Sequence, residues 1–433
     1  MSKFNPWNNI PKVDSSSKTI NFNHNQNIDF EDFSYLARGN GRSYGDVCIN
    51  SNGSLILNQK NNSIIKFDSK KGVLNCQTGI TINEVLKKIV PEGWFLPVVP
   101  GTSQVTIGGS IANDIHGKNH HKVGSFGNFL LSFTILRSNG KIVRCSLEEN
   151  SDLFKATVGG LGLTGLILTA EIKLLKINNE FIESGVKRFS SIDEFVNINS
   201  EMEKKYDYTV SWIDFNFSKN NTVRGIYHYG NHLGLNKTNK KWVDKNLAIS
   251  FPVTTPFSLV NNLSLKILNN FYFFINKETN LKIKNYKSFF FPLDVIKNWN
   301  RAYGKNGFYQ YQFVVSLHCA SEVISLVVQE LKSYNHRPAL GVLKTFGNIK
   351  SHGIISFPRN GITLAIDLQN KGKKTLELLE VLDQIILQFN GKVYPAKDCR
   401  MSSTTFNEMY QNFKNFKQFI DPKFSSSFFE RIK

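Results

Sequence analysis

The densest group of residues able to do chemistry lies between Gly101 and His121, in GTSQVTIGGSIANDIHGKNHH. This stretch holds two adjacent glycines, a Lys and three of the nine histidines of the chain. Three kinds of chemistry fit these residue types. They are a metal site, a catalytic histidine, and a segment of backbone that lies against a flat ligand.

The spacing of the histidines does not favour a metal site. His116 and His120 stand four residues apart, which can place two zinc ligands on one face of a helix. No third ligand follows at a regular interval, and no acidic residue completes an HExxH pattern. We therefore expect no metal here. His116 is then either a hydrogen-bonded core residue or a residue in contact with a ligand, while His120 and His121 have no assigned role.

Two further glycine-rich segments point to a long ligand. Residues 37–46 read ARGNGRSYGD, and residues 158–167 read VGGLGLTGLI. Glycine allows turns with positive φ and lets backbone N–H groups approach a diphosphate closely. Neither segment contains the GxxxxGK[ST] sequence of a P-loop or a GxGxxG fingerprint that opens a helix. Three glycine-rich turns in this part of the chain predict one long ligand between them, such as a dinucleotide.

The elements expected around these turns mix strands and helices. Thr81 and Glu84 form a capping box, and apolar residues follow at helical spacing, so a helix begins at Thr81. Asn139 and Gly140 predict a hairpin turn, because both residue types tolerate positive φ. We also expect a Ser-capped helix over 149–160. Strands are expected at 53–58, 71–78, 130–138, 141–146 and 162–177.

The pattern changes near residue 180. From there to about 390 we expect antiparallel strands alternating with amphipathic helices, and short polar-aromatic helices follow over 391–433. The expected strands are 207–216, 222–230, 309–318 and 361–369, and the expected helices are 321–334 and 375–389. In the strand at 309–318, Gln310 and Gln312 share one face, as alternate residues do. Two amides on one face suit hydrogen bonding to a sugar, although a polar solvent face has the same pattern.

Composition narrows the class of protein. A chain of 433 residues is long enough for two domains. Its 53 Lys and Arg against 34 Asp and Glu give a net charge of +19, which attracts polyanions or anionic surfaces, or simply reflects a Lys- and Asn-rich composition. Five scattered cysteines without a CxxC argue against disulfides and structural zinc and fit a reducing compartment. We see neither a signal peptide nor an apolar run long enough to span a membrane.

The glycine-rich segments together resemble the FAD-binding half of the vanillyl-alcohol-oxidase type flavoproteins. More closely, the chain resembles the decaprenylphosphoryl-β-D-ribose 2′-oxidase family, with DIHGKNHH and YQYQFVV as the specific motifs. The resemblance covers nearly the whole chain from about residue 30. It is carried by RGxGRSYGD, PGTxxVTxGGxIxxDIHGKNHH, GSFG and ATVGGxGLTG, and by segments 290–315, 342–347, 394–400 and 421–432.

This resemblance implies an α+β, two-domain FAD-binding fold with an antiparallel-sheet substrate domain. Residues 1–180 would form the FAD-binding domain and residues 181–390 the substrate-binding domain, with residues 391–433 packing back on the FAD domain. Some relatives attach FAD covalently through a His in the first glycine loop. Here Gly41 to Gly45 contains neither His nor Cys, so we expect non-covalent FAD.

The resemblance also implies roles for single residues. Catalytic roles fall to Lys397 first, then to His116 and Tyr44. Ala365 stands where the mycobacterial members carry Cys, so no thiol is available there. FAD contacts are implied for Arg38, Gly39, Asn40, Gly41, Arg42, Ser43, Tyr44, Gly101, Thr102, Gly108, Gly109, Asn113, His116, Gly117, Gly124, Ser125, Gly127, Gly162 and Gly165. Substrate contacts are implied for Lys118, Trp212, Gln310, Gln312, Lys344, Phe346, Asp367 and Lys397.

The implied reaction is oxidation of the 2′-hydroxyl of a polyprenyl-phosphoryl ribose to a keto sugar, as the first half of a ribose-to-arabinose epimerisation in cell-envelope polysaccharide synthesis. An NAD(P)H-dependent short-chain reductase would be the partner for the second half. Residues 251–275 would form a lid or groove for the lipid tail, and the basic surplus would hold the protein at an anionic membrane. The expected location is the cytoplasm, or the periphery of the inner membrane on its cytoplasmic or periplasmic face.

Two alternatives belong to other functional classes. One is a soluble FAD-dependent oxidase of a free sugar or polyol. The other is a basic nucleic-acid-binding protein without catalytic activity. The second lacks a zinc finger, an RNP motif and helix-turn-helix spacing, and its basic residues are dispersed, so we expect no nucleic-acid partner.

Overall fold

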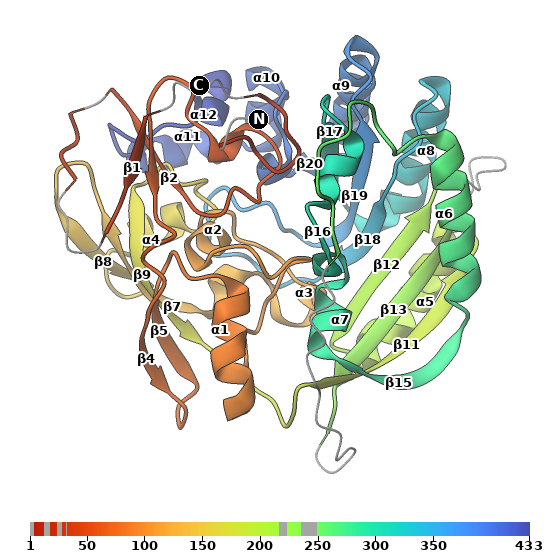
Figure 1. Ribbon diagram of the computed structural model, residues 1–433, viewed down its shortest axis with the longest axis horizontal. Helices are drawn as coiled ribbons and strands as arrows, with labels where there is room; N and C mark the ends of the chain where they lie inside the picture. Colours follow the sequence, from red (N-terminus) through yellow and green to blue (C-terminus); the bar gives the residue numbers. More distant parts are fainter. Residues whose placement is uncertain (1–3, 13–17, 24–27, 32, 216–222, 235–248) are drawn as a thin grey trace.

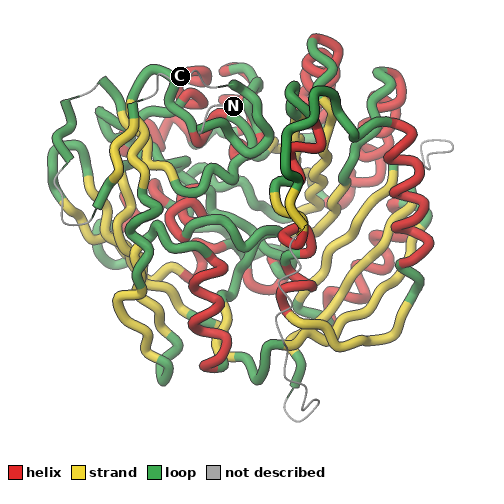
Figure 2. Tube along the Cα trace, viewed as in Figure 1, coloured by secondary structure: helices red, strands yellow, loops and turns green. Residues whose placement is uncertain are grey.

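Two groups of β-strands lie on opposite sides of a central region of loops and short helices. The computed structural model describes residues 4–12, 18–23, 28–31, 33–215, 223–234 and 249–433. The first part of the chain forms one side, and the middle and much of the last part form the other (Figure 1). Figure 2 shows the loops gathered between the two sheets, where segments distant in sequence come close together.

The first side contains an antiparallel sheet of five strands and a small parallel sheet. The larger sheet has the order β4 (Ile64–Asp68), β5 (Val73–Gln77), β9 (Leu166–Lys173), β7 (Leu130–Leu136) and β8 (Ile142–Ser146). The smaller has the order β1 (Thr19–Asn21), β3 (Ser54–Leu57) and β2 (Tyr35–Arg38). Helices α1 (Ile82–Ile89), α2 (Ile107–Ala112), α3 (His120–Val123) and α4 (Ser151–Thr157) accompany them.

Local signals in this half act as the sequence predicts, with one exception. The Thr81–Glu84 capping box starts α1, and Gly140 turns the β7–β8 hairpin with a φ of 78°. The predicted Ser cap of α4 is wrong, because Asn150 is the N-cap residue. Asn150 has a φ of 51°, which Asn tolerates better than most residues, and its side chain donates to Arg144 O at 2.7 Å. This bond ties the start of α4 to β8.

The second side is a single antiparallel sheet of eight strands. Its order is β15 (Thr279–Asn285), β11 (Phe181–Phe189), β13 (Arg224–His232), β12 (Tyr208–Asp214), β18 (Gly341–Phe346), β19 (Gly361–Gln369), β17 (Phe308–Val315) and β20 (Lys392–Val393). Helices α5 (Ile192–Lys205), α8 (Ala320–Ser333) and α9 (Lys373–Gln388) cover one face of this sheet (Figure 1). Helix α6 (Asn262–Ile275) lies over part of the opposite face.

Alternation along the central strands decides which side chains face the first half of the chain. On β17, Tyr311 and Phe313 pack in the core under α8 and α9. Gln310 and Gln312 therefore lie on the opposite face, as predicted from their spacing. The same alternation on β18 and β19 places Lys344 and Asp367 on that face, so one sheet face gathers polar groups from three neighbouring strands.

The last part of the chain connects both sides. After β20 it forms α10 (Ser403–Met409), α11 (Phe413–Phe416) and α12 (Ser427–Ile432), whose apolar residues share a core with α8 and α9. The backbone N–H of Asp421 donates to Leu163 O at 2.9 Å, and that of Ser427 donates to Ile49 O at 2.8 Å. The whole chain is α+β, as predicted.

Short elements complete the structure. Strand β6 (Trp94–Phe95) pairs with β10 (Leu175–Lys176), and β14 (Ile249–Ser250) pairs with β16 (Ile296–Lys297). Helix α7 (Tyr286–Phe290) and two 3-10 turns, Pro292–Val295 and Trp299–Tyr303, lead from the edge strand β15 toward β17. These last segments form part of the wall of the central cavity.

Candidate active site

A cavity of about 1080 Å³ lies between the two sides of the chain. This volume is just above the usual range for small-molecule sites and suits a large ligand. All three glycine-rich segments line it, opposite the polar face of β17, β18 and β19. The cavity-lining residues among the predicted site residues are Arg38, Gly39, Asn40, Gly41, Arg42, Ser43, Tyr44, Gly101, Thr102, Gly108, Gly109, Asn113, His116, Gly162, Gly165, Gln310, Gln312, Lys344 and Lys397.

The first glycine loop requires glycine at its two ends. Gly41 has a φ of 57° and Gly45 a φ of 110°, both in the left-handed region that disfavours other residues. A Cβ at Gly45 would lie 2.1 Å from Asp398 O, so this loop touches the backbone beside Lys397. The backbone N–H of Tyr44 also donates to Ala396 O at 3.0 Å. The first loop and the C-terminal segment are thus joined at the cavity wall.

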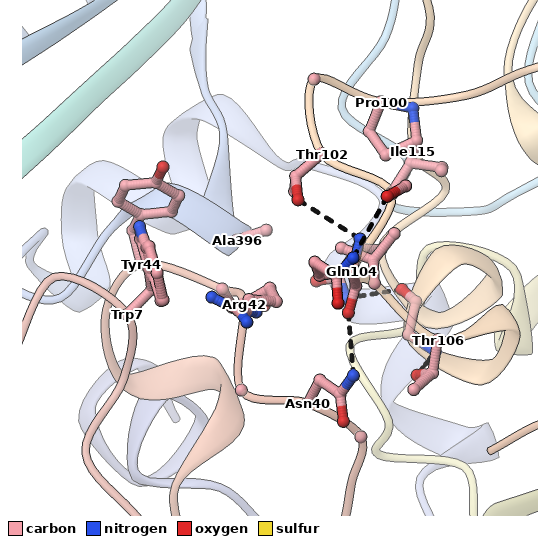
Figure 3. Close-up of a pocket in the computed structure, with 18 of the residues that line it drawn as sticks. Trp7, Asn40, Arg42, Tyr44, Pro100, Thr102, Gln104, Thr106, Ile115 and Ala396 are labelled. Carbon is pink, nitrogen blue, oxygen red and sulfur yellow. Dashed lines mark hydrogen bonds between the residues drawn. The ribbon is translucent and has the colours of Figure 1, made fainter. Parts of the chain in front are cut away.

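The first and second glycine loops are joined by a side chain. Asn40 donates from Nδ2 to Gln104 O at 2.9 Å, as the dashed line in Figure 3 shows. The guanidinium of Arg42 lies 4.1 Å from the centre of the Trp7 ring. Arg42 lines the cavity, and its buried Nε has no hydrogen-bond partner among the described residues. A buried cationic donor without a partner fits an anionic ligand.

The second glycine loop turns into α2 at the cavity. Thr106 is the N-cap residue, and its Oγ1 accepts from Gly109 N at 3.2 Å. A Cβ at Gly101 would have no atom within 4 Å, which leaves open space beside the backbone there. Asn113 ends α2 and donates to Gly109 O at 2.8 Å, while its buried Oδ1 has no partner among the described residues.

Asp114 was not identified from the sequence, although it organises this region. The residue is fully buried and has a φ of 40°. Its carboxylate accepts from Gly127 N at 2.9 Å, from Ser125 Oγ at 2.9 Å and from Ser356 Oγ at 2.6 Å. Ser125 and Gly127 therefore belong to this buried network. The Asp in DIHG was the available signal, but spacing alone does not tell which way its carboxylate turns.

His116 joins two of the predicted substrate residues. Its Nδ1 lies 3.0 Å from Lys344 Nζ, and its Nε2 lies 3.0 Å from Gln312 Nε2. Phe346 packs edge-on against the imidazole, with ring centroids 4.7 Å apart. Burial lowers the pKa of His116 well below its usual range, and the charge of Lys344 lowers it further. His116 is therefore neutral at neutral pH.

Lys397 lies against Tyr44 at the cavity wall. Its Nζ is 3.8 Å from the centre of the Tyr44 ring. Burial lowers the pKa of Lys397 to about 7, Asp367 opposes that shift, and Lys344 adds to it. A lysine with this pKa is partly a neutral amine at neutral pH, so it can accept a proton.

Asp367 does not line the cavity but supports the groups that do. Gln310 Nε2 donates to one carboxylate oxygen at 2.6 Å, and the Tyr303 hydroxyl lies 3.4 Å from the other. Burial raises the pKa of Asp367 to about 6, while its hydrogen bond from Gln310 and the charge of Lys397 lower it. The carboxylate therefore holds Gln310 in place and remains largely charged at neutral pH.

Lys344 is a buried lysine that makes no ion pair with an acidic side chain in the part of the chain that the structure describes. Burial lowers its pKa to about 7. Lys118 lies deeper, donates to Phe289 O and sits 4.6 Å from the centre of the Phe289 ring. Burial lowers its pKa to about 7 as well, with the charges of Lys344 and Lys284 contributing.

Several predicted site residues lie behind the cavity wall. Trp212 packs edge-on against Tyr272 of α6, with ring centroids 5.0 Å apart. Its pairing partner on β18, Val342, does line the cavity. The predicted site residues that do not line the cavity are Gly117, Lys118, Gly124, Ser125, Gly127, Trp212, Phe346 and Asp367.

Two further residues of the site were missed. Tyr394 lines the cavity, donates to Asn113 O at 2.8 Å and stacks on Phe357 with centroids 4.5 Å apart. Thr363 Oγ1 accepts from Gln312 Nε2 at 3.1 Å. Thr363 and Asp367 are four residues apart on β19, so strand alternation predicts that they share one face of the sheet. The contact of Thr363 with Gln312 depends on strand register, which the sequence does not show.

His120 and His121 pack away from the cavity. His120 contacts Phe346 with ring centroids 4.4 Å apart, and His121 Nε2 lies 3.1 Å from Tyr206 O. Over the described ranges, no three His, Cys, Asp or Glu side chains gather closely enough to hold a metal ion. Within those same ranges, no helix is both long and apolar enough to cross a membrane.

The fold and this cavity define the class of protein. Residues 25–146 match the FAD binding domain family, and the chain is an FAD-dependent oxidoreductase of the vanillyl-alcohol-oxidase type. It is 34% identical over 411 residues to decaprenylphosphoryl-beta-D-ribose oxidase from Mycolicibacterium smegmatis, covering 92% of this chain and 89% of that protein. The chain belongs to the decaprenylphosphoryl-β-D-ribose oxidase family.

Other relatives match only part of the chain. L-Gulonolactone oxidase from Bos taurus is 27% identical over 186 residues, which cover 43% of this chain and 41% of that protein. Delta(24)-sterol reductase from Homo sapiens is 32% identical over 112 residues, which cover 26% of this chain and 22% of that protein.

The residues at the cavity fit FAD. Glycine-rich backbone lines one wall, and Arg42 Nε and Asn113 Oδ1 offer a donor and an acceptor without partners in the described structure. The cavity extends from these groups to Lys344 and Lys397. A dinucleotide held along the glycine loops would therefore leave the polar face of β17, β18 and β19 for a second, smaller group.

Proposed function

We propose that this protein oxidises the 2′-hydroxyl of a polyprenyl-phosphoryl ribose to a 2′-keto sugar, as the first half of a ribose-to-arabinose epimerisation in cell-envelope polysaccharide synthesis. The observation that carries the proposal is Lys397, a buried lysine with a pKa near 7 in the cavity that the glycine loops line. Family membership supports this activity rather than a free-sugar oxidase or a nucleic-acid-binding protein.

The three glycine loops would hold FAD without a covalent bond. Arg42 and Asn113 supply polar contacts, and Gly101 and Gly109 leave room for the ligand beside the backbone. When bound, FAD supplies the acceptor for the two electrons and the hydrogen that leave the sugar carbon. Cys48 also lines the cavity, but burial raises the pKa of its thiol, so it is not a reactive thiolate.

Lys397 takes the proton of the sugar hydroxyl. Its neutral amine accepts that proton while the C–H bond of the same carbon breaks, so the C–O bond becomes a carbonyl. Asp367 stabilises the resulting ammonium, because its charge raises the pKa of Lys397. The Tyr44 ring also favours this ammonium, by a cation–π contact.

His116, Gln312 and Lys344 bind and orient the sugar and its phosphate. His116 is neutral, and its two ring nitrogens lie within hydrogen-bond distance of Lys344 Nζ and Gln312 Nε2. Lys344 keeps donors free for a phosphate, and the negative charge of that phosphate would restore the usual pKa of the lysine. Gln310 and Gln312 supply amide groups on the same strand face for sugar hydroxyls. Lys118 adds positive potential behind Lys344.

An NAD(P)H-dependent short-chain reductase would reduce the keto sugar from the other face and complete the epimerisation. Because the substrate is lipid-linked, the protein would work at the periphery of the inner membrane, on its cytoplasmic or periplasmic face. Both points rest on the chemistry of the proposed product and substrate.

Anaerobic reduction of the purified flavoprotein tests the proposal. A polyprenyl-phosphoryl ribose with a short prenyl chain should bleach the visible flavin absorption and yield a 2′-keto sugar, detected by mass spectrometry after borodeuteride trapping. Free ribose and alditols serve as controls and should leave the absorption unchanged. Bleaching by free alditols at equal concentration, or none with the phosphoryl sugar, would overturn the proposal.

A further inference from the structure

Helix α6 has its apolar side turned outward. Leu263, Ile267, Phe271 and Phe274 are 69%, 61%, 62% and 69% exposed, and their spacing places them in one stripe. Leu265 and Asn269 are the buried residues of the helix. A helix that covers a sheet normally turns its apolar stripe inward. The reversed arrangement leaves a continuous apolar stripe without a partner within the described chain.

Polar contacts hold α6 in this orientation. Asn269 Nδ2 donates to the buried Asp214 at 3.0 Å, and Arg224 Nη2 donates to Asn270 Oδ1 at 2.6 Å. The guanidinium groups of Arg188 and Arg224 both lie over the Phe273 ring, at 4.3 Å and 4.2 Å from its centre. These contacts fix the rotation of α6 about its axis. The polar side of the helix is bound to the sheet, and the apolar stripe therefore faces outward.

The apolar stripe continues beyond the helix. The preceding segment, residues 249–259, carries the exposed side chains of Ile249, Val253 and Phe257. This segment is held along the cavity wall: β14 pairs with β16, and Leu259 N donates to Ala302 O at 2.9 Å. In Figure 1, α6 runs along the outer margin of the eight-stranded sheet, and β16 lies between the two halves of the chain.

The same surface reaches the cavity. Leu293, Val295 and Ile296 are exposed apolar residues, and all three also line the cavity that holds Lys397. The exposed apolar residues of α6, of residues 249–259 and of residues 293–296 are together called the apolar surface below. A ligand with its polar end at Lys397 and an apolar tail would leave the cavity beside this surface.

The basic residues around the apolar surface indicate which kind of partner it binds. Residues 249–304 contain seven Lys and Arg but only two acidic residues, Glu278 and Asp294. Asp294 is engaged by Ser103, whose N and Oγ donate to it at 2.8 Å and 2.7 Å. A basic rim around apolar side chains fits anionic lipid headgroups over an acyl layer. A second copy of the chain fits less well, since two such basic faces repel each other.

We propose that the apolar surface docks on an anionic lipid bilayer with the cavity opening beside it, so that a lipid-linked substrate reaches Lys397 without leaving the membrane. The stripe of α6 enters the boundary between headgroups and acyl chains, and the lysines around it contact the headgroups. The identity of the substrate rests on the function proposed above, whereas the docking itself rests on the apolar surface and the basic residues around it.

Vesicle flotation of the full-length flavoprotein tests the docking. The protein should float with phosphatidylcholine vesicles that contain phosphatidylglycerol, and less with phosphatidylcholine alone or at high salt. The double variant Ile267→Glu/Phe271→Glu should bind about tenfold more weakly or worse. Ile142→Glu is the matched control, because Ile142 is 62% exposed on the distant strand β8. This variant should bind the vesicles as the wild type does. Flavin absorption and thermal unfolding establish that each variant is folded.

Activity separates the two proposals. The double variant should oxidise a short-chain, water-soluble substrate as fast as the wild type, but long-chain substrate in vesicles at least about tenfold more slowly. Wild-type protein that floats but oxidises neither substrate would contradict the proposed function and leave the docking intact. Equal flotation of wild type and double variant, no flotation of the wild type, or a dimer that the double variant abolishes would each overturn the docking proposal.

Discussion

The Nζ atom of Lys397 lies over the ring of Tyr44, 3.8 Å from its centre. This contact joins the first glycine loop to the segment after β20, and a backbone bond from Tyr44 to Ala396 supports it at 3.0 Å. The residue proposed as base is therefore positioned by the same loop that lines the FAD end of the cavity. Binding of the cofactor and placement of the base are structurally coupled.

Replacing Lys397 with Met should lower turnover about 100-fold or more while FAD stays bound. Met keeps the length of the side chain but cannot accept a proton. Initial rates and the flavin-to-protein absorbance ratio measure the two effects separately. Lys373→Met, at a solvent-exposed position on α9, is the control. Unchanged turnover in Lys397→Met would remove this residue from the mechanism.

The rate should rise with pH through an apparent pKa near 7, since the neutral form of Lys397 is the active base. Asp367 raises the pKa of Lys397, so Asp367→Asn should move this limb of the profile to lower pH. A pH profile of kcat/KM for both proteins checks the direction. A shift toward higher pH in the variant would contradict the proposed pairing.

Gly109→Trp should yield protein without bound FAD. Among the described residues outside its own helix, a Cβ at this position meets only Thr106 Oγ1, at 3.2 Å, so a large side chain would extend into the cavity. We expect poor folding as well, because the glycine loops lose their ligand. Gly109→Ala is the graded control and should keep most of the yellow colour. An intact flavin spectrum in Gly109→Trp would show that FAD does not lie along this loop.

Acid precipitation should release the flavin into the supernatant. The first glycine loop offers no His or Cys between Gly41 and Gly45, and the thiol of Cys48 is protonated because burial raises its pKa. Absorption spectra of the pellet and the supernatant show whether the flavin is released. A yellow pellet would contradict non-covalent binding, and peptide mass mapping would then identify the attachment residue.

His120→Leu should make the protein less sensitive to mild acid. Both ring nitrogens of His120 are buried without partners among the described residues, and burial lowers its pKa to about 3. The unfolded chain binds a proton below about pH 6.5, whereas the folded one does not, so stability falls as pH drops below that value. The variant should retain about 2 kcal/mol of the stability that the wild type loses between pH 7 and pH 5. Urea unfolding at pH 7 and pH 5 measures the free energy of unfolding of both proteins. An equal loss of stability in the wild type and the variant would contradict the prediction.

Much of the local structure could be read from the sequence. The glycine loops, the capping box at Thr81 and the hairpin at Gly140 depend on backbone angles that particular residue types favour. The common face of Gln310 and Gln312 follows from strand alternation. Helix α4 shows the limit of such signals, since Asn150 rather than Ser151 is its N-cap residue, and the Asn150 side chain donates to Arg144 O on β8 and caps no N–H of the helix.

Contacts between distant segments were decided by tertiary structure. Residue types alone did not show that Lys344 would meet Nδ1 of His116, that Asp114 would turn inward to Ser356, or that Trp212 would lie under α6. The sequence determined the family, the glycine loops and which strand faces are polar, because those depend on neighbours along the chain. Only tertiary packing decided the low pKa of Lys397 and the outward turn of α6, because burial and orientation depend on segments far apart in sequence.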